Sequence, residues 1–241
     1  MKLRSMQSTA PSARSLLLGL LAGASGLAGS ALSVVDVVGA EVFTVDSTQS
    51  SVSISGTVAG RTLHEQGSGS LTTHYQGTLV ADVGADTIQF LGQSQVVAVN
   101  SGSWQPLSDG SDGSEPANYG GTASFFLTTG VAAVREAQLD VTSGVVAVVN
   151  GQFSTQGLTF TIPADGYSSL AYRVEGAYNA AGAVSLAGRS ATGQIATASV
   201  TTWSGLQILT IPIQYTIYFT VVKQNDTSVT LSGQLVATRS L

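Results

Sequence analysis

The sequence predicts an all-β fold, a single antiparallel β-barrel or a strongly coiled β-sandwich, that follows an N-terminal signal peptide. Three observations lead to this prediction. Gly, Ser, Thr, Val and Ala dominate the chain and only 10% of its residues are charged, while helix-forming Glu, Lys, Arg and Met are scarce after residue 41. Apolar and polar residues alternate with the period of two that a half-buried strand requires. Gly, Asn, Asp or Ser separates most of these segments, as is typical of turns between strands.

The first forty residues have the layout of a secretory signal peptide. The basic residues of this leader are Lys2, Arg4 and Arg14. An apolar run of Leu, Ala and Gly follows at 16–32, and residues 38–40 are small enough for a cleavage site before Glu41. We therefore expect a signal peptide at 1–40, with a cut after Ala31 as the competing site. A retained membrane anchor is the alternative, although Gly and Ser dilute the run.

Cleavage at this point would leave one all-β domain at 41–241, which is long enough to bury a substantial core. This part carries six cations and thirteen carboxylates, a net charge of −7. Such an acidic surface repels phosphates, so we expect no nucleic acid partner. The chain has no cysteine, which suits a bacterial envelope protein and removes thiol nucleophiles and thiolate metal sites. The expected location is secreted or periplasmic, in the cell envelope.

The first clear strand pattern lies at 52–58 and the clearest at 209–222. The apolar residues of the later segment all fall on one face, whereas a helix would scatter them around its circumference. Pro212 has no N–H group, so this strand should have an edge or a bulge near its start. After a turn at 223–226, residues 229–237 form the return strand of a terminal hairpin.

Between these segments, further strands are predicted at 71–75, 87–93, 123–128, 133–142, 144–149, 158–162, 169–174 and 194–201. With the terminal hairpin and the first strand this gives about ten to twelve strands, enough to close a barrel or to stack two sheets. The length of the 209–222 strand favours a barrel or a strongly coiled sheet.

Residues for catalysis are few, and we predict that the protein is not an enzyme. His64 and His74 are the two histidines, and no Gly-x-Ser-x-Gly elbow marks a serine nucleophile. Two carboxylate pairs have the residue types that glycoside hydrolysis needs, Asp82 with Asp86 and Glu136 with Asp140. The first pair flanks a turn and the second lies on the polar face of the strand predicted at 133–142, so solvated side chains explain both.

One segment, 109–116, concentrates oxygen ligands of the kind that Ca²⁺ prefers. The candidate cation ligands in it are Asp109, Asp112 and Glu115. The segment does not follow the twelve-residue helix–loop–helix pattern, and a solvated connector is the alternative. We predict no other metal site and no cofactor.

The expected start of the mature chain resembles YceI-type periplasmic proteins, which open on an aromatic-x-hydrophobic-Asp-x-x-His-Ser-x-Val pattern. The matching positions are Phe43, Asp46, Ser50 and Val52, and Gln49 stands where that family has His. Residues 69–83, with Gly77-Thr78-Leu79 and Asp82, are similar to the second strand of those proteins. In its general sequence character, the chain is also similar to uncharacterised secreted β proteins of environmental bacteria. The YceI resemblance implies a lipocalin-like antiparallel barrel that holds a long isoprenoid chain.

Independently of the resemblance, the apolar face of the 209–222 strand could line such a cavity, or simply fill a core. The candidate ligand-lining residues are Leu209, Ile211, Ile213, Tyr215, Ile217 and Phe219. The sequence thus predicts a secreted, non-enzymatic structural, interaction or binding module. Its expected partner is an apolar small molecule or a surface protein or glycan, and the mature domain is not expected to span a membrane. An eight-stranded outer-membrane barrel and a secreted hydrolase are the alternatives.

Overall fold

The computed structural model describes residues 39–58, 60–125, 128–177, 179–192, 194–219 and 227–241, except for the side chains of Phe125, Thr192 and Phe219. The chain divides into the units Met1–Val35 and Asp36–Leu241, and all described residues belong to the second. The segment predicted as a signal peptide lies outside the described residues, apart from Gly39 and Ala40. The all-β prediction is confirmed: twenty-one strands and one short 3₁₀ helix, η1 (Thr155–Gly157), make up the secondary structure of the described part.

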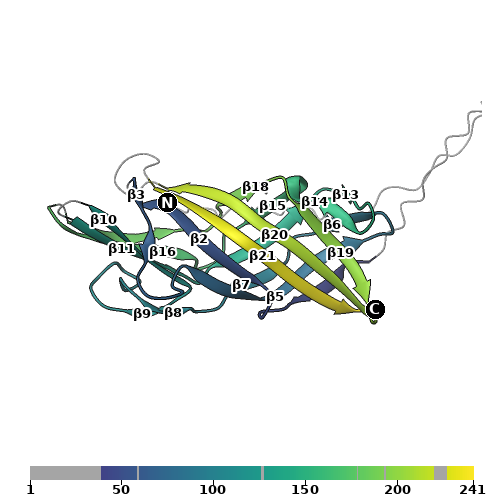
Figure 1. Cartoon of the computed structure of the whole chain (residues 1–241), viewed down its shortest axis with the longest axis horizontal. Coiled ribbons are helices and arrows are strands. Elements are labelled where there is room, and N and C mark those ends of the chain that lie inside the picture. The colour runs from purple at the N-terminus through teal and green to yellow at the C-terminus, as the bar shows by residue number, and fades with distance from the viewer. Residues whose placement is uncertain (1–38, 59, 126–127, 178, 193, 220–226) are drawn as a thin grey trace, which may run out of the picture. The chain divides into compact units, whose positions relative to one another are not determined.

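The largest sheet is antiparallel and closes into a barrel (Figure 1). Its strands are β1 (Glu41–Val45), β2 (Ser51–Val58), β3 (Arg61–Thr62), β5 (Thr72–Val83), β6 (Thr87–Phe90), β7 (Gln95–Ala98), β12 (Gln138–Ser143), β13 (Val146–Ala147), β14 (Gln152–Ser154), β15 (Leu158–Thr161), β18 (Ser190–Thr192), β19 (Thr197–Trp203), β20 (Leu206–Phe219) and β21 (Thr227–Ser240). Several pairs of consecutive strands are two parts of one interrupted barrel strand and occupy the same position in the barrel. Counted this way, eight positions follow one another around the barrel: β1/β2, β5, β6/β7, β12/β13, β14/β15, β18/β19, β20 and β21.

The barrel closes at a bend between β18 and β19. Before the bend, β18 pairs with β15; after it, β19 pairs with β14 on one side and β20 on the other. Thr155 is buried at this bend: its hydroxyl donates to the carbonyl of Gln194 and accepts from the N–H of Ala196, 3.0 Å away. The N–H of Gln194 in turn donates to the carbonyl of Gln214 on β20. The Thr155 side chain therefore stabilises the bend that lets β18 pair with β15 and β19 pair with β14 and β20.

A second sheet, of five strands, is not part of the barrel wall but contributes side chains to the same core. It consists of β17 (Ala180–Ser185), β16 (Ser169–Gly176), β11 (Thr128–Arg135), β10 (Tyr119–Phe125) and β4 (His64–Glu65), in that order. Tyr119, Ala132 and Leu170 of this sheet pack in the same apolar cluster as the barrel strands. A two-stranded hairpin, β8 (Gly102–Trp104) with β9 (Glu115–Ala117), lies beside it.

The predicted terminal hairpin is confirmed in its strands, which pair from Leu206↔Ser240 to Phe219↔Thr227, while its turn lies outside the described residues. Pro212 also sits where its missing N–H is tolerated. Pairing between β19 and β20 ends at Thr210, and Pro212 is the next residue of β20 whose backbone faces that side.

Two predicted strands are wrong: the segment 123–128 covers the end of β10 and the start of β11, and the segment 133–142 is two strands in different sheets. Glu136 adopts a φ of 52°, a left-handed conformation that breaks the strand between β11 and β12. Alternation in the sequence continues through this break, because both halves bury one face. Glu136 and Asp140 consequently do not share the polar face of one strand.

The residues that carry the YceI resemblance build the junction between β1 and β2. Asp46 accepts hydrogen bonds from the hydroxyl of Thr48 (2.7 Å), the side-chain amide of Gln49 (2.6 Å) and the N–H of Thr48 (2.9 Å), and these donors hold the pKa of Asp46 below its ordinary value. The buried hydroxyl of Ser50 both accepts from the N–H and donates to the carbonyl of Val236 on β21. These side chains therefore hold a backbone junction together.

Gly77 marks the closest approach of two barrel strands. Its φ is +117°, and a Cβ atom at this position would lie 1.8 Å from the carbonyl oxygen of Gln95 on β7. A side chain here would therefore force β5 and β7 apart, whereas Gly144 has open space around it.

We expect Gly77→Ala to lower the free energy of unfolding by at least about 2 kcal/mol, because it combines a backbone clash with an unfavourable φ. Gly144→Ala is the matched control and should change it by no more than about 0.5 kcal/mol. Urea unfolding of both variants measures the difference, and equal values would contradict the close approach.

Candidate functional site

The inner wall of β20 is the first candidate site. Leu209, Ile211, Ile213 and Tyr215 are buried and point into the barrel, and Ile217 is half-buried. The side chain of Phe219, the sixth predicted lining residue, lies outside the described residues. The wall faces other side chains for most of its length: Tyr215, for example, stacks on Phe160 of β15 with ring centroids 5.5 Å apart.

Of the predicted lining residues whose side chains the structure describes, Tyr215 and Ile217 border a small, partly open cavity. It measures about 50 Å³ and is lined almost entirely by apolar side chains of the barrel and the five-stranded sheet. Its lining residues are Ile54, Tyr75, Tyr119, Val134, Ala137, Gln138, Leu139, Ile162, Leu170, Leu186, Tyr215, Ile217, Val229 and Leu231. The cavity thus lies where the second sheet meets the barrel. Its volume is far below the roughly 300 Å³ at which ligand pockets usually begin.

Three buried phenols surround this cavity. The hydroxyls of Tyr75 and Tyr119 are 3.0 Å apart, and Tyr119 donates to the carbonyl of Val52. Burial raises the pKa of Tyr75 to about 12 and also raises the pKa values of Tyr119 and Tyr215. The phenols are therefore neutral in the folded protein and act as hydrogen-bonding groups.

The buried phenols should make stability depend on alkaline pH. The phenols of the unfolded chain ionise near pH 10, whereas the buried phenols of the folded protein resist ionisation. The free energy of unfolding should therefore keep its full value below pH 10 and decrease as the pH rises toward 12. Tyr75→Phe should cost about 1 kcal/mol near pH 8 and make the alkaline decline shallower.

Urea unfolding at a series of pH values measures this dependence, and the absorbance of phenolate follows ionisation directly. Tyr167→Phe is the control, because the Tyr167 side chain is exposed. If the wild-type tyrosines all ionise in one step near pH 10, the buried cluster does not exist in solution.

The three candidate cation ligands lie in separate surroundings. Asp109 folds back on Ser111, accepting from its N–H (2.8 Å) and hydroxyl (2.6 Å), and these bonds lower the pKa of Asp109. Asp112 is exposed, and Glu115 lies against Arg135. Within the described ranges, no group of three or more His, Cys, Asp or Glu side chains could hold a metal ion.

Arg135 anchors the loop that the sequence singled out for cation binding. Its Nε lies 3.0 Å from Oε1 of Glu115, an ion pair without hydrogen-bond geometry, and its Nη2 donates to the carbonyls of Trp104 (3.1 Å) and Pro106 (2.5 Å). Burial lowers the pKa of Arg135, while the charge of Glu115 opposes this effect. The role of Arg135 is not visible in the sequence, because Arg135 and its partners are about twenty to thirty residues apart in the chain.

We expect Arg135→Met to lower the free energy of unfolding by about 3–5 kcal/mol, because it leaves Glu115 and two loop carbonyls without their partner. Arg173→Met is the control: Arg173 forms a more exposed ion pair with Glu175 and should change stability by less than about 1 kcal/mol. Urea unfolding provides the comparison, and a loss below 1 kcal/mol for Arg135→Met would show that the loop does not depend on it.

The larger hollow on the barrel is an open groove of about 450 Å³ on its outside. It lies where β7 and β12 diverge, and Asp140 fills the gap by accepting from the N–H groups of Ser94 and Val141, both at 2.9 Å. Its rim carries the amides of Gln93, Gln95 and Gln138 and the carboxylate of Asp165. Such a groove offers hydrogen-bonding groups to an external ligand.

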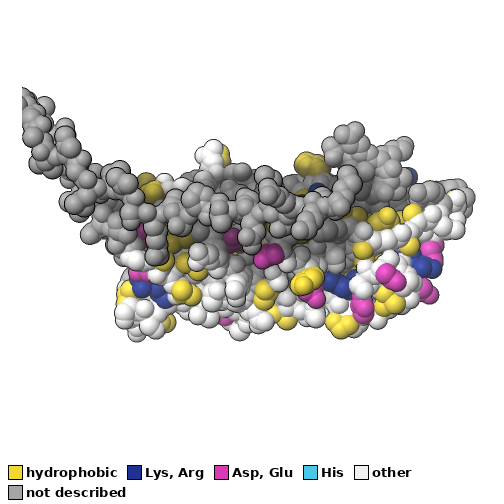
Figure 2. All heavy atoms as spheres, turned by 180° about the vertical axis from the view of Figure 1, so that it is seen from behind, with side chains coloured by type: hydrophobic (Ala, Val, Ile, Leu, Met, Phe, Trp, Pro, Cys, Tyr) yellow, Lys and Arg dark blue, Asp and Glu magenta, His cyan; other side chains and the backbone are white. Residues whose placement is uncertain are grey.

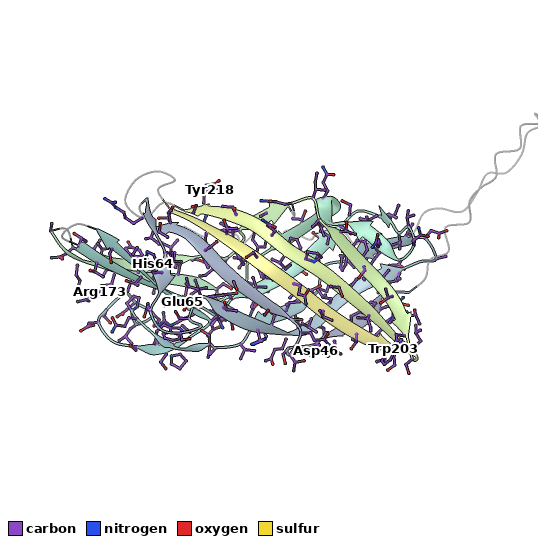
Figure 3. All side chains as sticks on the ribbon, in the orientation of Figure 1. Asp46, His64, Glu65, Arg173, Trp203 and Tyr218 are labelled. Carbon is purple, nitrogen blue, oxygen red and sulfur yellow. The ribbon has the colours of Figure 1, made fainter. Side chains whose placement is uncertain are left out.

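The remaining sequence candidates lie on different strands and turns, and Figure 3 labels one of them, His64. His64 lies on β4 and His74 on β5, and both side chains are exposed. Asp82 is half-buried at the end of β5 and Asp86 is exposed in the turn that follows.

No protein-family model, no curated protein and no solved structure matches this chain. Among the residues that the structure describes, no helix is long and apolar enough to cross a membrane.

Proposed function

We propose that the chain is an exported, non-enzymatic β-barrel domain that serves as a structural or interaction module of the cell envelope. The observation that carries this proposal is the packed interior of the barrel. The wall of β20 that the sequence offers for a ligand is occupied by side chains of the core, and the cavity beside it holds only about 50 Å³. Export rests on the layout of residues 1–40.

The outer surface supports contact with a protein or glycan. Outward hydroxyls face each other across neighbouring strands: Thr216 with Thr230 (2.8 Å), Thr57 with Ser228 (3.1 Å), and Ser53 with Thr72 (2.8 Å). On the face shown in Figure 2, the hydrophobic and charged side chains that are drawn in colour are interspersed. A lipid-embedded barrel would instead need an outward apolar band of about 25 Å, so these polar rows favour an aqueous surface.

An apolar small molecule remains the second candidate partner. The observation in its favour is the apolar cavity beside Tyr215, with the Tyr75 and Tyr119 hydroxyls at its wall. A long isoprenoid chain would have to displace core side chains, because pockets for such ligands measure about 300–1,000 Å³.

Native mass spectrometry distinguishes the two candidates. The full chain is expressed with its own leader, and the product is purified from the soluble envelope fraction without detergent. We expect the mass of the protein alone, because the interior is packed. A surplus mass that organic extraction removes would contradict the packed module and would identify the cargo of a carrier.

The same measurement tests the leader. A mass equal to residues 41–241 supports cleavage after Ala40, and a mass nine residues larger supports cleavage after Ala31.

A further inference from the structure

An outward apolar row encircles part of one end of the barrel. Trp203 on β19 pairs with Leu206 on β20, and Leu206 pairs with Ser240 on β21. The pairing Thr44↔Thr238, continued by two residues, brings Val42 opposite Ser240. Directly paired residues point to the same side of a sheet, so these side chains share the outer face.

The row continues on the following strands. Val42 pairs with Val80 on β5, and the N–H of Leu91 donates to the carbonyl of Val80 (3.1 Å). We call Trp203, Leu206, Val42, Val80 and Leu91 the apolar row. Trp203 is 71% exposed, Val42 57%, Leu91 39% and Leu206 36%.

Other outward rows of the same strands are more polar. Two residues further along, Thr201, Ile208, Thr238, Thr44 and Thr78 form the corresponding row. Near the middle of β20, the row of Gln214, Ser232, Ser53 and Thr72 contains no apolar residue. Among the described side chains of these strands, the exposed large apolar ones therefore lie at this end of the barrel, apart from Tyr218 on β20.

Trp203 projects beside the tip of a tight hairpin. Ser204 and Gly205 both have positive φ angles, 50° and 77°, the conformation of a two-residue β-turn. Figure 3 shows Trp203 at one end of the long strands β20 and β21 and Tyr218 toward the other. A large amphipathic ring at an exposed tip is the side chain that favours the boundary between lipid and water.

From this geometry, we propose that the apolar row docks the barrel end-on to a lipid surface, with the Trp203 hairpin entering the interface. The course of the chain supports lipid over other partners. The apolar run at 16–32 leads into the domain at Glu41, which directly precedes Val42, so at most about 27 Å of extended chain separates them. In the precursor, Val42 is therefore tethered to the apolar run by a chain of at most that length.

The charges near this end of the barrel predict how the row binds. Arg239 and Glu41 form an ion pair on the inner side of these strands, where the Arg239 guanidinium lies over the ring of the buried Phe43, 5.5 Å from the centroid. Burial raises the pKa of Glu41, the charge of Arg239 opposes this effect, and Asp82 adds a smaller rise. With no excess of positive charge among these residues, docking should depend on apolar contact and should not require anionic lipid. A single row suits shallow insertion of about 5–10 Å.

Vesicle flotation of residues 41–241, which contain every described strand, tests the proposal. We expect binding to phosphatidylcholine vesicles at least as strong as to vesicles that contain phosphatidylglycerol. The double variant Trp203→Ser/Leu206→Ser should weaken binding at least about tenfold, because each lost large apolar contact is worth roughly that factor. Tyr218→Ser, which removes an exposed aromatic ring elsewhere on β20, is the matched control and should bind as the wild type does.

The emission of tryptophan provides a second readout. Trp203 emission should shift to the blue on binding, whereas Trp104, which packs against Gly102 and Gly120, should supply a constant background. The substituted side chains are exposed, so the variants should keep the wild-type unfolding midpoint.

Three results would overturn the proposal: no flotation of the wild type, flotation that the double variant retains, or a dimer in solution that the double variant abolishes in the absence of lipid binding. The vesicle assay uses purified protein and does not depend on cargo. Its failure therefore leaves the interaction module intact, and a bound cargo would leave end-on docking intact.

Discussion

The architecture depends on closure of the sheet at the bend between β18 and β19. One segment of chain pairs with β15 before the bend and with β14 and β20 after it, and the buried hydroxyl of Thr155 satisfies backbone groups that the bend exposes. Each hydrogen bond of this kind contributes about 0.5–1.5 kcal/mol, so the buried Thr155 side chain stabilises the bend from inside the wall. Closure in turn gives every barrel strand an inner face.

That inner face is used for packing, and this shapes the functional conclusion. The second sheet brings Tyr119 and Leu170 into the same core that β20 supplies with Tyr215, and a cavity of only about 50 Å³ remains between them. Recognition is therefore better placed on the outside. The hydroxyl rows, the groove at Asp140 and the apolar row at the barrel end are all outward features.

Much of the barrel could be predicted from the sequence, because the alternation of apolar and polar residues is a local signal. β20 and β21 follow their predicted pattern, with Pro212 at the edge of pairing, since inward residues must be apolar whichever strands surround them. The break at Glu136 escaped the same reasoning, because a positive φ at one non-glycine residue leaves no trace in the alternation. The candidate cation loop illustrates a related limit: Glu115 and Arg135 meet only through the fold, so their pairing is invisible in either segment.

By itself, the sequence determined the all-β class, the inward face of each long strand and the acidic, cysteine-free character of the chain, because these follow from residue type and a period of two. Only the tertiary structure decided which strands are neighbours, that the second sheet shares the core of the barrel, and that Trp203, Leu206, Val42, Val80 and Leu91 lie in one row. The physical reason is that pairing register acts between segments far apart in the chain, whereas alternation acts within one segment.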